Sequence, residues 1–214
     1  MSIMDIKNLR LNYEKSTIDF KNLSDSPIQL FLNWFSDALK INKKEANACV
    51  LSTVSLNDYP SSRVVLLKEI NENGFTFFTN YQSSKAKDIA SNPNVALNFY
   101  WPELERQVRI TGTAEKISVN DSDTYFESRP RDSQMGAWLS DQSEVIGLDY
   151  NFMDTLNSLE TKFKDKSLTR PLHWGGYCIV PVKVEFWQGR PSRLHDRLVY
   201  EIDGNKWNKK RLAP

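Results

Sequence analysis

The pattern of apolar positions near the N-terminus predicts one amphipathic helix. Ser26-Pro27 is typical of a helix start, because serine caps the first turn and proline lacks only an N–H that would be unpaired there. The apolar residues that follow recur at helical spacing on one face: Phe31, Trp34, Phe35, Ala38 and Leu39. We expect this helix to end at the polar run 42–44 and to follow a mobile N-terminal arm, residues 1–25.

From residue 48 onward the apolar positions fall in short β-rich runs separated by turns. Strand-like runs, filled by β-branched and aromatic residues, lie at 49–54, 62–68, 75–79, 95–101, 107–116, 177–187 and 198–202. Residues 84–90 and parts of 119–164 are helical in character, with a break at 129–132. Consecutive strands joined by short turns favour an antiparallel sheet closed into a barrel over a parallel sheet interleaved with helices. The sequence therefore predicts a mainly β fold, an antiparallel barrel of about seven strands with three or four flanking helices.

The same pattern bears on domain organisation and on membranes. No low-complexity linker and no internal repeat interrupts the 214 residues, so we expect a single domain over 1–214. The unbroken apolar runs, such as 64–67, are far shorter than the roughly 20 residues of a membrane span. Residues 1–10 lack the apolar core of a secretory signal. We therefore expect a cytoplasmic protein that does not enter a membrane.

The charge balance argues against a surface that binds nucleic acid. The chain has 28 Lys plus Arg and 27 Asp plus Glu, which gives a formal net charge of +1. Nucleic-acid-binding proteins rely on a basic surface, so an oligonucleotide-binding β-barrel that uses Tyr100 and Trp101 is disfavoured. A small anionic ligand would have to be bound by individually placed cations.

The glycines, histidines and cysteines exclude several kinds of site. No two of the eight glycines form a G-x-G, which removes the dinucleotide fingerprint and the glycine-rich phosphate loop together. Phosphate groups would then be held by side chains. His173 and His195 are far apart, as are Cys49 and Cys178, and none has the spacing of metal ligands. We expect no metal site.

Four polar residues stand out in strands that otherwise read as core. Arg63 and Lys68 bracket the apolar run 64–67, while Gln107 and Arg109 alternate with apolar neighbours. Long cationic side chains at strand ends can simply extend to solvent. A period of two places Gln107 and Arg109 on one face, which is normally the solvent face. From these residues alone, ligand binding and solvent exposure both stay open.

Two further clusters are denser in polar chemistry. Tyr125, Arg129 and Ser133 recur at i, i+4 and i+8, so a helix-like turn would bring a phenol, a guanidinium and a hydroxyl to one side, although Pro130 interrupts a regular helix. Such a trio suits a phosphate monoester, and a surface capping cluster is the alternative. Residues 184–197 contain three arginines, a histidine and a tryptophan, which is typical of a loop that carries ligand-binding groups.

The second of these clusters carries a specific motif. It reads Glu185-Phe186-Trp187-Gln188, four intervening residues, then Arg193-Leu194-His195-Asp196-Arg197. This motif resembles the signature of the pyridoxamine 5′-phosphate oxidase family. Further segments resemble the same family in order along the chain: 63–68, 78–80, 105–109, 128–134, 142–143 and 211–214. The resemblance extends from Pro27 to the C-terminus, and the combination of motifs is specific.

The resemblance implies a fold, a cofactor and a reaction. The fold is an FMN-binding split β-barrel, assembled as a homodimer with two flavin sites at the subunit interface. The reaction is the oxidation of pyridoxamine 5′-phosphate and pyridoxine 5′-phosphate to pyridoxal 5′-phosphate, with O₂ as electron acceptor and H₂O₂ released. These implications agree with an antiparallel barrel in which side chains bind phosphate groups.

The resemblance also implies a role for individual residues. FMN is held by residues from all parts of the chain: Arg63, Val64, Leu66, Leu67, Lys68, Phe78, Thr79, Ser84, Lys85, Gln107, Gln142, Ser143, Trp187 and Arg197. The substrate phosphate is bound by Lys68, Tyr125, Arg129 and Ser133. Arg193 and His195 are the catalytic residues, facing the substrate near the reacting carbon. Arg10 and Tyr13 resemble an Arg-x-x-Tyr pair that the family uses in a lid.

One position departs from the family pattern. Ser84 stands where we expect an arginine, so one guanidinium that would meet the FMN phosphate is missing. A charge-assisted hydrogen bond contributes roughly 1.5–3 kcal/mol, or about one to two decades in affinity. We expect the chain to retain FMN more weakly for this reason.

A second class of function is a non-catalytic split barrel that binds flavin, haem or pyridoxal phosphate as a carrier or sensor. Such a protein would keep the flavin residues without those for the substrate. Tyr125, Arg129, Ser133, Arg193 and His195 are all present, which favours the enzyme. The sequence leaves open which of the two substrates is preferred, whether a second pyridoxal phosphate site exists, and whether His195 acts as a base or only orients the substrate.

Overall fold

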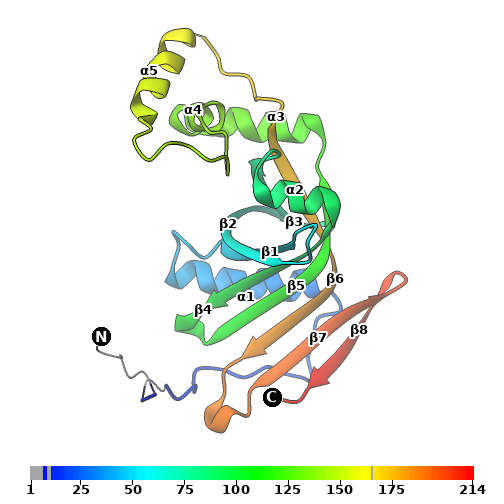
Figure 1. The fold of residues 1–214 in the computed structure, drawn as a ribbon. Coiled ribbons are helices and arrows are strands. Elements are labelled where there is room, and N and C mark those ends of the chain that lie inside the picture. The colour runs from blue at the N-terminus through cyan, green and yellow to red at the C-terminus, as the bar shows by residue number, and fades with distance from the viewer. Residues whose placement is uncertain (1–6, 9–10, 165) are drawn as a thin grey trace. The chain divides into compact units, whose positions relative to one another are not determined.

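The structure is a computed structural model that describes residues 7–8, 11–164 and 166–214. Within them, eight strands form one sheet in the order β3-β2-β1-β4-β5-β6-β7-β8 (Figure 1). The strands are β1 (Ala48–Val54), β2 (Pro60–Asn71), β3 (Gly74–Asn80), β4 (Asn94–Trp101), β5 (Arg106–Lys116), β6 (Trp174–Gln188), β7 (Asp196–Asp203) and β8 (Lys206–Leu212). The α-helices are α1 (Pro27–Ile41), α2 (Ser84–Ser91), α3 (Val119–Ser128), α4 (Arg131–Leu139) and α5 (Phe152–Lys162).

The sheet closes into a barrel through an antiparallel pairing of β3 with β6. In this pairing Phe75 lies opposite Ile179 and Asn80 lies opposite Trp174. Six strands, β3-β2-β1-β4-β5-β6, therefore form the barrel, and β7 and β8 extend the sheet beyond β6. The prediction of a mainly β antiparallel barrel is confirmed.

The predicted number of elements was too low. Strand β8 was not expected, because its residues are mostly polar and exposed and show no apolar alternation. It is a strand because it pairs antiparallel with β7. The pairing begins with Arg197 opposite Leu212 and ends with Asp203 opposite Lys206. Residues 119–164 form three separate helices, so the described chain has five α-helices rather than three or four. A break is present but is shorter than the predicted 129–132: α3 ends at Ser128 and α4 begins at Arg131, so only residues 129–130 lie between the helices.

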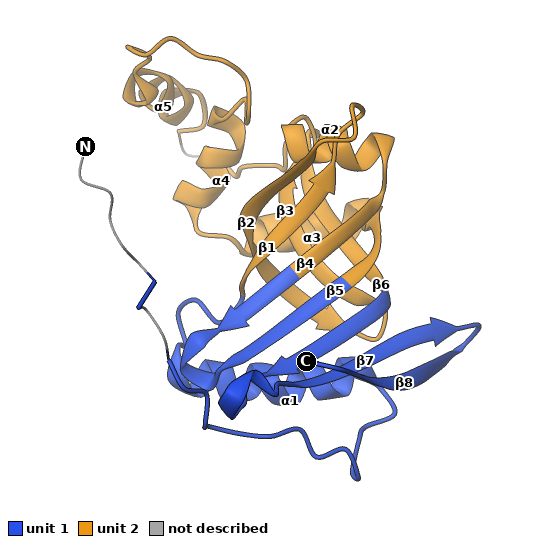
Figure 2. Cartoon of the chain, turned by 60° about the horizontal axis from the view of Figure 1, so that its bottom comes forward, with its two compact units in different colours: residues 1–47, 98–110, 182–214 blue, residues 48–97, 111–181 orange. Residues whose placement is uncertain are grey.

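The chain divides into two compact units (Figure 2). Unit 1 comprises residues 1–47, 98–110 and 182–214, and unit 2 comprises residues 48–97 and 111–181. Strands β4, β5 and β6 contribute residues to both. The single domain over 1–214 stays a prediction.

Aromatic packing forms the core of unit 1. Helix α1 begins as predicted, with the Ser26 side chain accepting the backbone N–H of Gln29. The Phe31 ring lies 5.0 Å from that of Phe99, and the Trp34 ring lies 5.2 Å from that of Phe186. These contacts bury the apolar face of α1 against strand residues, which stabilises an amphipathic helix far more than its intrinsic propensity does.

Unit 2 combines β1, β2 and β3 with four helices, of which α3, α4 and α5 lie together (Figure 1). Phe126, Met135, Ala137, Leu168 and Trp174 form a buried apolar cluster in this part of the chain. Gly74 begins β3 with a φ of +148°, and a Cβ there would lie 2.1 Å from the carbonyl oxygen of Ile179. Only glycine therefore allows the β2–β3 turn to approach β6 this closely. No described helix is long and apolar enough to cross a membrane.

Candidate functional site

A cavity of about 610 Å³ lies in unit 2. Its wall includes many of the residues predicted to bind FMN or the substrate phosphate: Val64, Leu66, Lys68, Phe78, Thr79, Lys85, Tyr125, Arg129, Ser133 and Gln142. These side chains come from β2, β3, α2, α3, α4 and the segments that follow the last two helices. The described lining contains Lys68, Lys85 and Arg129 but no aspartate or glutamate. The cavity thus gathers positive charge without a carboxylate to balance it, which suits an anionic ligand.

Lys85 is the most strongly perturbed cation in this cavity. Its Nζ donates to three neutral acceptors: Oε1 of Gln142 at 2.7 Å, Oγ of Ser83 at 3.0 Å and Oγ1 of Thr79 at 3.2 Å. Burial, and secondarily the charge of Arg63, lowers the pKa of Lys85 to about 8. A lysine in this state gains from an anion that replaces the water it has lost.

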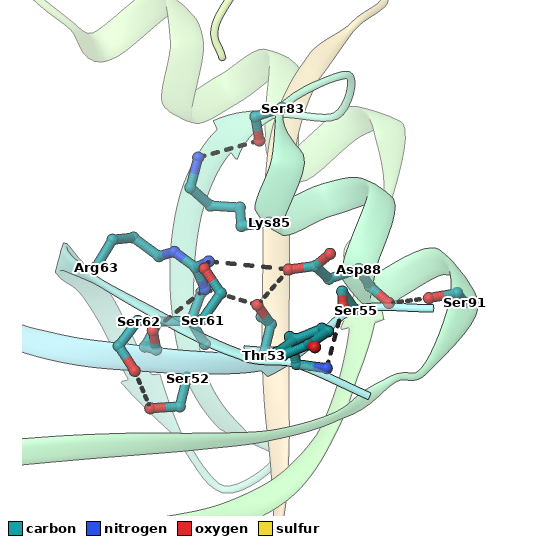
Figure 3. A network of polar contacts seen from close by, with 12 residues as sticks. Ser52, Thr53, Ser55, Ser61, Ser62, Arg63, Ser83, Lys85, Asp88 and Ser91 are labelled. Atoms are coloured by element: carbon teal, nitrogen blue, oxygen red, sulfur yellow. Dashed lines mark hydrogen bonds and ion pairs between the residues drawn. The ribbon is translucent and has the colours of Figure 1, made fainter. Parts of the chain in front are cut away.

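Arg63 belongs to a polar network of side chains (Figure 3). It is not among the residues that line the cavity. One guanidinium nitrogen donates to Oγ1 of Thr53 at 2.7 Å and the other to Oγ of Ser61 at 2.7 Å. Thr53 in turn donates to Oδ2 of Asp88 at 2.6 Å, and Arg63 lies 3.8 Å from the same oxygen. Burial lowers the pKa of Arg63, and the charge of Asp88 opposes that shift. The network fixes a second cation near Lys85 within unit 2.

Arg129 has a buried nitrogen without a protein partner. Its guanidinium lies over the Trp174 ring, 4.5 Å from the ring centroid, and the rings of Phe78 and Tyr125 stack 3.9 Å apart nearby in the same wall. Nη1 of Arg129 is the one buried side-chain nitrogen or oxygen of the described residues without a hydrogen-bond partner. An unpaired buried donor costs about 1–3 kcal/mol, so this atom marks a place for an acceptor from a ligand.

Tyr125, Arg129 and Ser133 reach one cavity without forming one continuous helix. Tyr125 is on α3, Ser133 is on α4, and Arg129 lies in the extended link between them. The predicted convergence is therefore present in the structure, whereas the helical register that suggested it is interrupted at Pro130. The reason is that a proline disfavours the helical conformation of the residue before it.

A second cavity, of about 540 Å³, lies in unit 1 and contains the predicted catalytic residues. It is lined by Leu11, Asn12, Tyr13, Trp187, Arg190, Ser192, Arg193 and His195. The His195 ring lies 4.7 Å from the Trp187 ring and 5.7 Å from the Tyr13 ring, so the three aromatic groups contact one another. Ser192 and Arg193 both have left-handed backbone conformations, with φ of 57° and 61°. Such strain in non-glycine residues is common in functional loops.

The N-terminal arm is fastened at this cavity by polar contacts. Nη1 of Arg190 donates to the carbonyl oxygen of Ser16 at 3.1 Å, and the N–H of Ile18 donates to Oδ2 of Asp196 at 3.3 Å. The N–H of Lys15 donates to Oε2 of Glu105 at 2.9 Å. These contacts hold the segment after Tyr13, so the Tyr13 ring can form part of the cavity wall. Arg10, its predicted lid partner, lies outside the described residues.

The remaining predicted residues line neither cavity. Leu67 is buried in the core, and Ser84 is exposed at the first position of α2. Gln107 donates to Oδ1 of Asn98 at 2.8 Å, and Arg197 contacts Glu185 at 2.8 Å. Ser143 is exposed and has a φ of 77°.

Sequence reasoning missed Trp174 and Arg190 as members of the two cavity walls. In the sequence, Trp174 looks like an ordinary core aromatic residue. Only the structure shows that its ring lies under the guanidinium of Arg129. Arg190 is one of the four intervening residues inside the 185–197 motif, and its charge was the one available signal.

Two family models match this chain, one after the other along the sequence. A family model described as pyridoxamine 5′-phosphate oxidase matches residues 35–152. A second, described as the pyridoxine 5′-phosphate oxidase C-terminal dimerisation region, matches residues 174–214.

Relatives match along nearly the whole chain. A pyridoxine/pyridoxamine 5′-phosphate oxidase 2 of Hydrogenovibrio crunogenus is 49% identical over 211 residues, covering 99% of each chain. A pyridoxine/pyridoxamine 5′-phosphate oxidase of Actinobacillus pleuropneumoniae is 48% identical, covering 99% of this chain and all of the relative. Among solved structures, PhzG from Burkholderia lata in complex with tetrahydrophenazine-1-carboxylic acid has a TM-score of 0.85 at 27% identity, covering 92% of this chain and 96% of PhzG.

Proposed function

Because the chain belongs to the pyridoxamine 5′-phosphate oxidase family, we propose that it is an FMN-dependent enzyme that oxidises pyridoxamine 5′-phosphate and pyridoxine 5′-phosphate to pyridoxal 5′-phosphate. The observation that carries this function is the cavity of unit 2. It contains three cations, no described carboxylate and a buried Arg129 nitrogen that lacks a partner. Both the cofactor and the substrate carry a phosphate that such a cavity can bind.

The FMN phosphate fits the donors around Lys85. Lys85, Thr79 and Gln142 already lie within hydrogen-bond distance of one another, and Arg63 is fixed in the same unit. A cation that is bonded only to neutral oxygens can exchange them for phosphate oxygens without breaking an ion pair. Val64, Leu66, Lys68 and Phe78 line the same cavity. On the family resemblance alone, we also assign five further residues to FMN: Leu67, Gln107, Ser143, Trp187 and Arg197.

The substrate phosphate fits the donors around Arg129. Tyr125 and Ser133 offer hydroxyl groups, and Lys68 offers an ammonium group in the same wall. Anchoring at this non-reacting end fixes the position of the substrate, so that binding energy is used to orient the carbon that reacts. Arg193 and His195 orient the reacting end.

When bound, FMN supplies the hydride acceptor for the C4′ carbon of the substrate. The chain's own residues bind the two phosphates, orient the substrate ring and exclude water. The overall reaction would use O₂ as the electron acceptor and release H₂O₂.

The assembly that goes with this function is a homodimer with a flavin site at each subunit interface. The match of residues 174–214 to a dimerisation region supports it. The cytoplasmic location stays a prediction of the sequence. A non-catalytic carrier of flavin or haem would have no use for a second phosphate site at the unpaired Arg129 nitrogen and its two hydroxyl neighbours, which disfavours that form of the alternative. A carrier of pyridoxal phosphate would bind the phosphate but would form no aldehyde in the assay below.

A single assay tests the proposal. Purified protein is loaded with FMN, pyridoxamine 5′-phosphate is added in air, and both peroxide and the aldehyde product are followed. We expect one peroxide for each aldehyde formed, and the same stoichiometry with pyridoxine 5′-phosphate. Protein that binds no flavin, or that binds it and forms no aldehyde from either substrate, would contradict the proposed function.

A further inference from the structure

The imidazole of His195 has one nitrogen already occupied by the backbone. The N–H of Arg190 donates to Nδ1 of His195 at 3.1 Å, which closes the loop between β6 and β7. The ring is partly buried, with Trp187 and Tyr13 packed against it. The position of the ring is thus determined by its two aromatic neighbours and by this hydrogen bond.

This hydrogen bond determines which nitrogen of a neutral His195 carries the proton. A backbone N–H can only donate, so Nδ1 must offer its lone pair, and the proton of the neutral ring lies on Nε2. Nε2 then has no lone pair to give. A general base needs a free lone pair within reach of the proton that it removes. The ring therefore offers its surroundings a single polar group, the Nε2–H donor.

The charged groups around the ring oppose its protonation. Burial, followed by the charge of Arg193, lowers the pKa of His195. Arg190 is the second guanidinium in the cavity wall, and Tyr13 is the titratable group that the arm contributes. The carboxylate of Asp196, the next residue in the chain, already accepts the N–H of Ile18 and lies 3.1 Å from Arg211 and 3.7 Å from Arg190. A doubly protonated ring would also lose the Arg190 hydrogen bond.

From this geometry we infer that His195 acts in the oxidation as a hydrogen-bond donor through Nε2–H and not as the acceptor of a substrate proton. The inference rests on the proposed function. The balance of the reaction does not need a protein base: C4′ loses a hydride with both electrons to FMN, and the proton of an alcohol substrate passes to water. An amine substrate enters as the free base, and water then replaces its nitrogen, which leaves as ammonium.

The tautomer can be measured directly, because the chain has only two histidines. The other, His173, contacts the carbonyl oxygen of Ala137 through Nε2 and is not part of the unit 1 cavity. FMN-loaded His173→Gln protein labelled with nitrogen-15 histidine then gives the signals of His195 alone. We expect the neutral ring to have Nε2 protonated and Nδ1 unprotonated. A proton on Nδ1, or a mixture of the two tautomers, would overturn the inference.

Two variants separate a donor from a base in turnover. In His195→Gln the side-chain NH₂ can take the place of Nε2–H, but no basic nitrogen remains, whereas His195→Leu lacks both. If His195 is a hydrogen-bond donor, we expect kcat to fall about tenfold in His195→Leu and clearly less in His195→Gln. If His195 is a general base, kcat would fall on the order of 10²-fold or more in both variants, and both would show the same altered pH profile.

The flavin content and thermal midpoint of each variant show whether it has folded. If the wild-type protein oxidises neither substrate, the proposed function fails. The nitrogen-15 measurement still decides the tautomer, so the two failures are distinguishable.

Discussion

Nζ of Lys85 lies 2.7 Å from Oε1 of Gln142, which joins helix α2 to the segment after α4 through a partly buried cation. No carboxylate of the described residues forms an ion pair with it. The lysine is thus placed for an anion that comes from outside the chain. Its lowered pKa makes this role measurable.

We expect FMN affinity to fall as the pH rises through the pKa of Lys85. That pKa is lowered to about 8, and a lysine loses its charge above its pKa, so attraction for the phosphate weakens in alkaline solution. The Kd of FMN should rise roughly tenfold between about pH 7 and about pH 9, measured by quenching of flavin fluorescence. Riboflavin, which lacks the phosphate, should show no such rise, and Lys85→Gln should remove it. An FMN affinity that is flat over this range would show that Lys85 does not bind the phosphate.

Restoring an arginine at position 84 should tighten FMN binding. Ser84 is exposed at the start of α2, one residue before Lys85, so the longer side chain has space. An added charge-assisted hydrogen bond is worth roughly 1.5–3 kcal/mol, so we expect Ser84→Arg to lower the Kd of FMN by about 10- to 100-fold. Ala90→Arg adds the same charge at an exposed position near the other end of α2 and is the matched control. Equal effects of the two variants would mean that charge alone, rather than its position, controls the affinity.

Replacing Arg129 should lower the activity of the protein without lowering its thermal stability. Arg129→Met removes the unpaired buried nitrogen while it keeps an apolar contact with Trp174. We expect kcat/KM to fall roughly 10- to 100-fold, because a charged donor to the substrate phosphate is lost. The thermal midpoint should stay the same or rise by about 2–4 °C for each kcal/mol of desolvation cost that is removed.

Arg131→Met is the matched control for Arg129, since Arg131 donates to the carbonyl oxygens of Phe163 and Lys166. It should reduce stability and leave kcat/KM close to that of the wild type. An Arg129→Met variant that is less stable and fully active would assign Arg129 a purely structural role.

Asp196, the first residue of β7, should hold the N-terminal arm in place. Its carboxylate accepts the N–H of Ile18 and contacts Arg190 and Arg211, so Asp196→Asn weakens three contacts at once. Proteolysis of the segment before Ile18 should become about tenfold faster, because the open state of the arm is more populated. The KM for the substrate should also rise, since Tyr13 lines the same cavity as Arg193 and His195. Asp203→Asn, at the exposed end of β7, should change neither quantity. An unaltered rate of cleavage in Asp196→Asn would mean that other contacts fasten the arm.

The sequence was sufficient to predict the strands whose side chains alternate between core and solvent or form a continuous apolar run. Strands β1 to β7 were predicted because a buried face leaves a period of two or a continuous apolar run. Strand β8 was missed because Lys206, Lys209 and Lys210 lie in an exposed edge strand, where pairing with β7 rather than burial determines the conformation.

The candidate site could be predicted only where the spacing of residues in the sequence indicated it. The spacing of Tyr125, Arg129 and Ser133 suggested a phosphate site, and these residues do line one cavity. The contact of Arg190 with His195 gave no signal in the sequence, because it is made by a backbone N–H that every residue except proline possesses.

The sequence by itself determined the chemistry that the protein can use: placed cations and hydroxyl groups in place of a glycine-rich phosphate loop, on a barrel of alternating strands. Only the tertiary structure decided the state of those groups. The pKa of Lys85, the unpaired nitrogen of Arg129 and the occupied Nδ1 of His195 all depend on neighbours that folding places around each group. Desolvation and hydrogen bonding are properties of these surroundings, so residue type and spacing alone do not contain them.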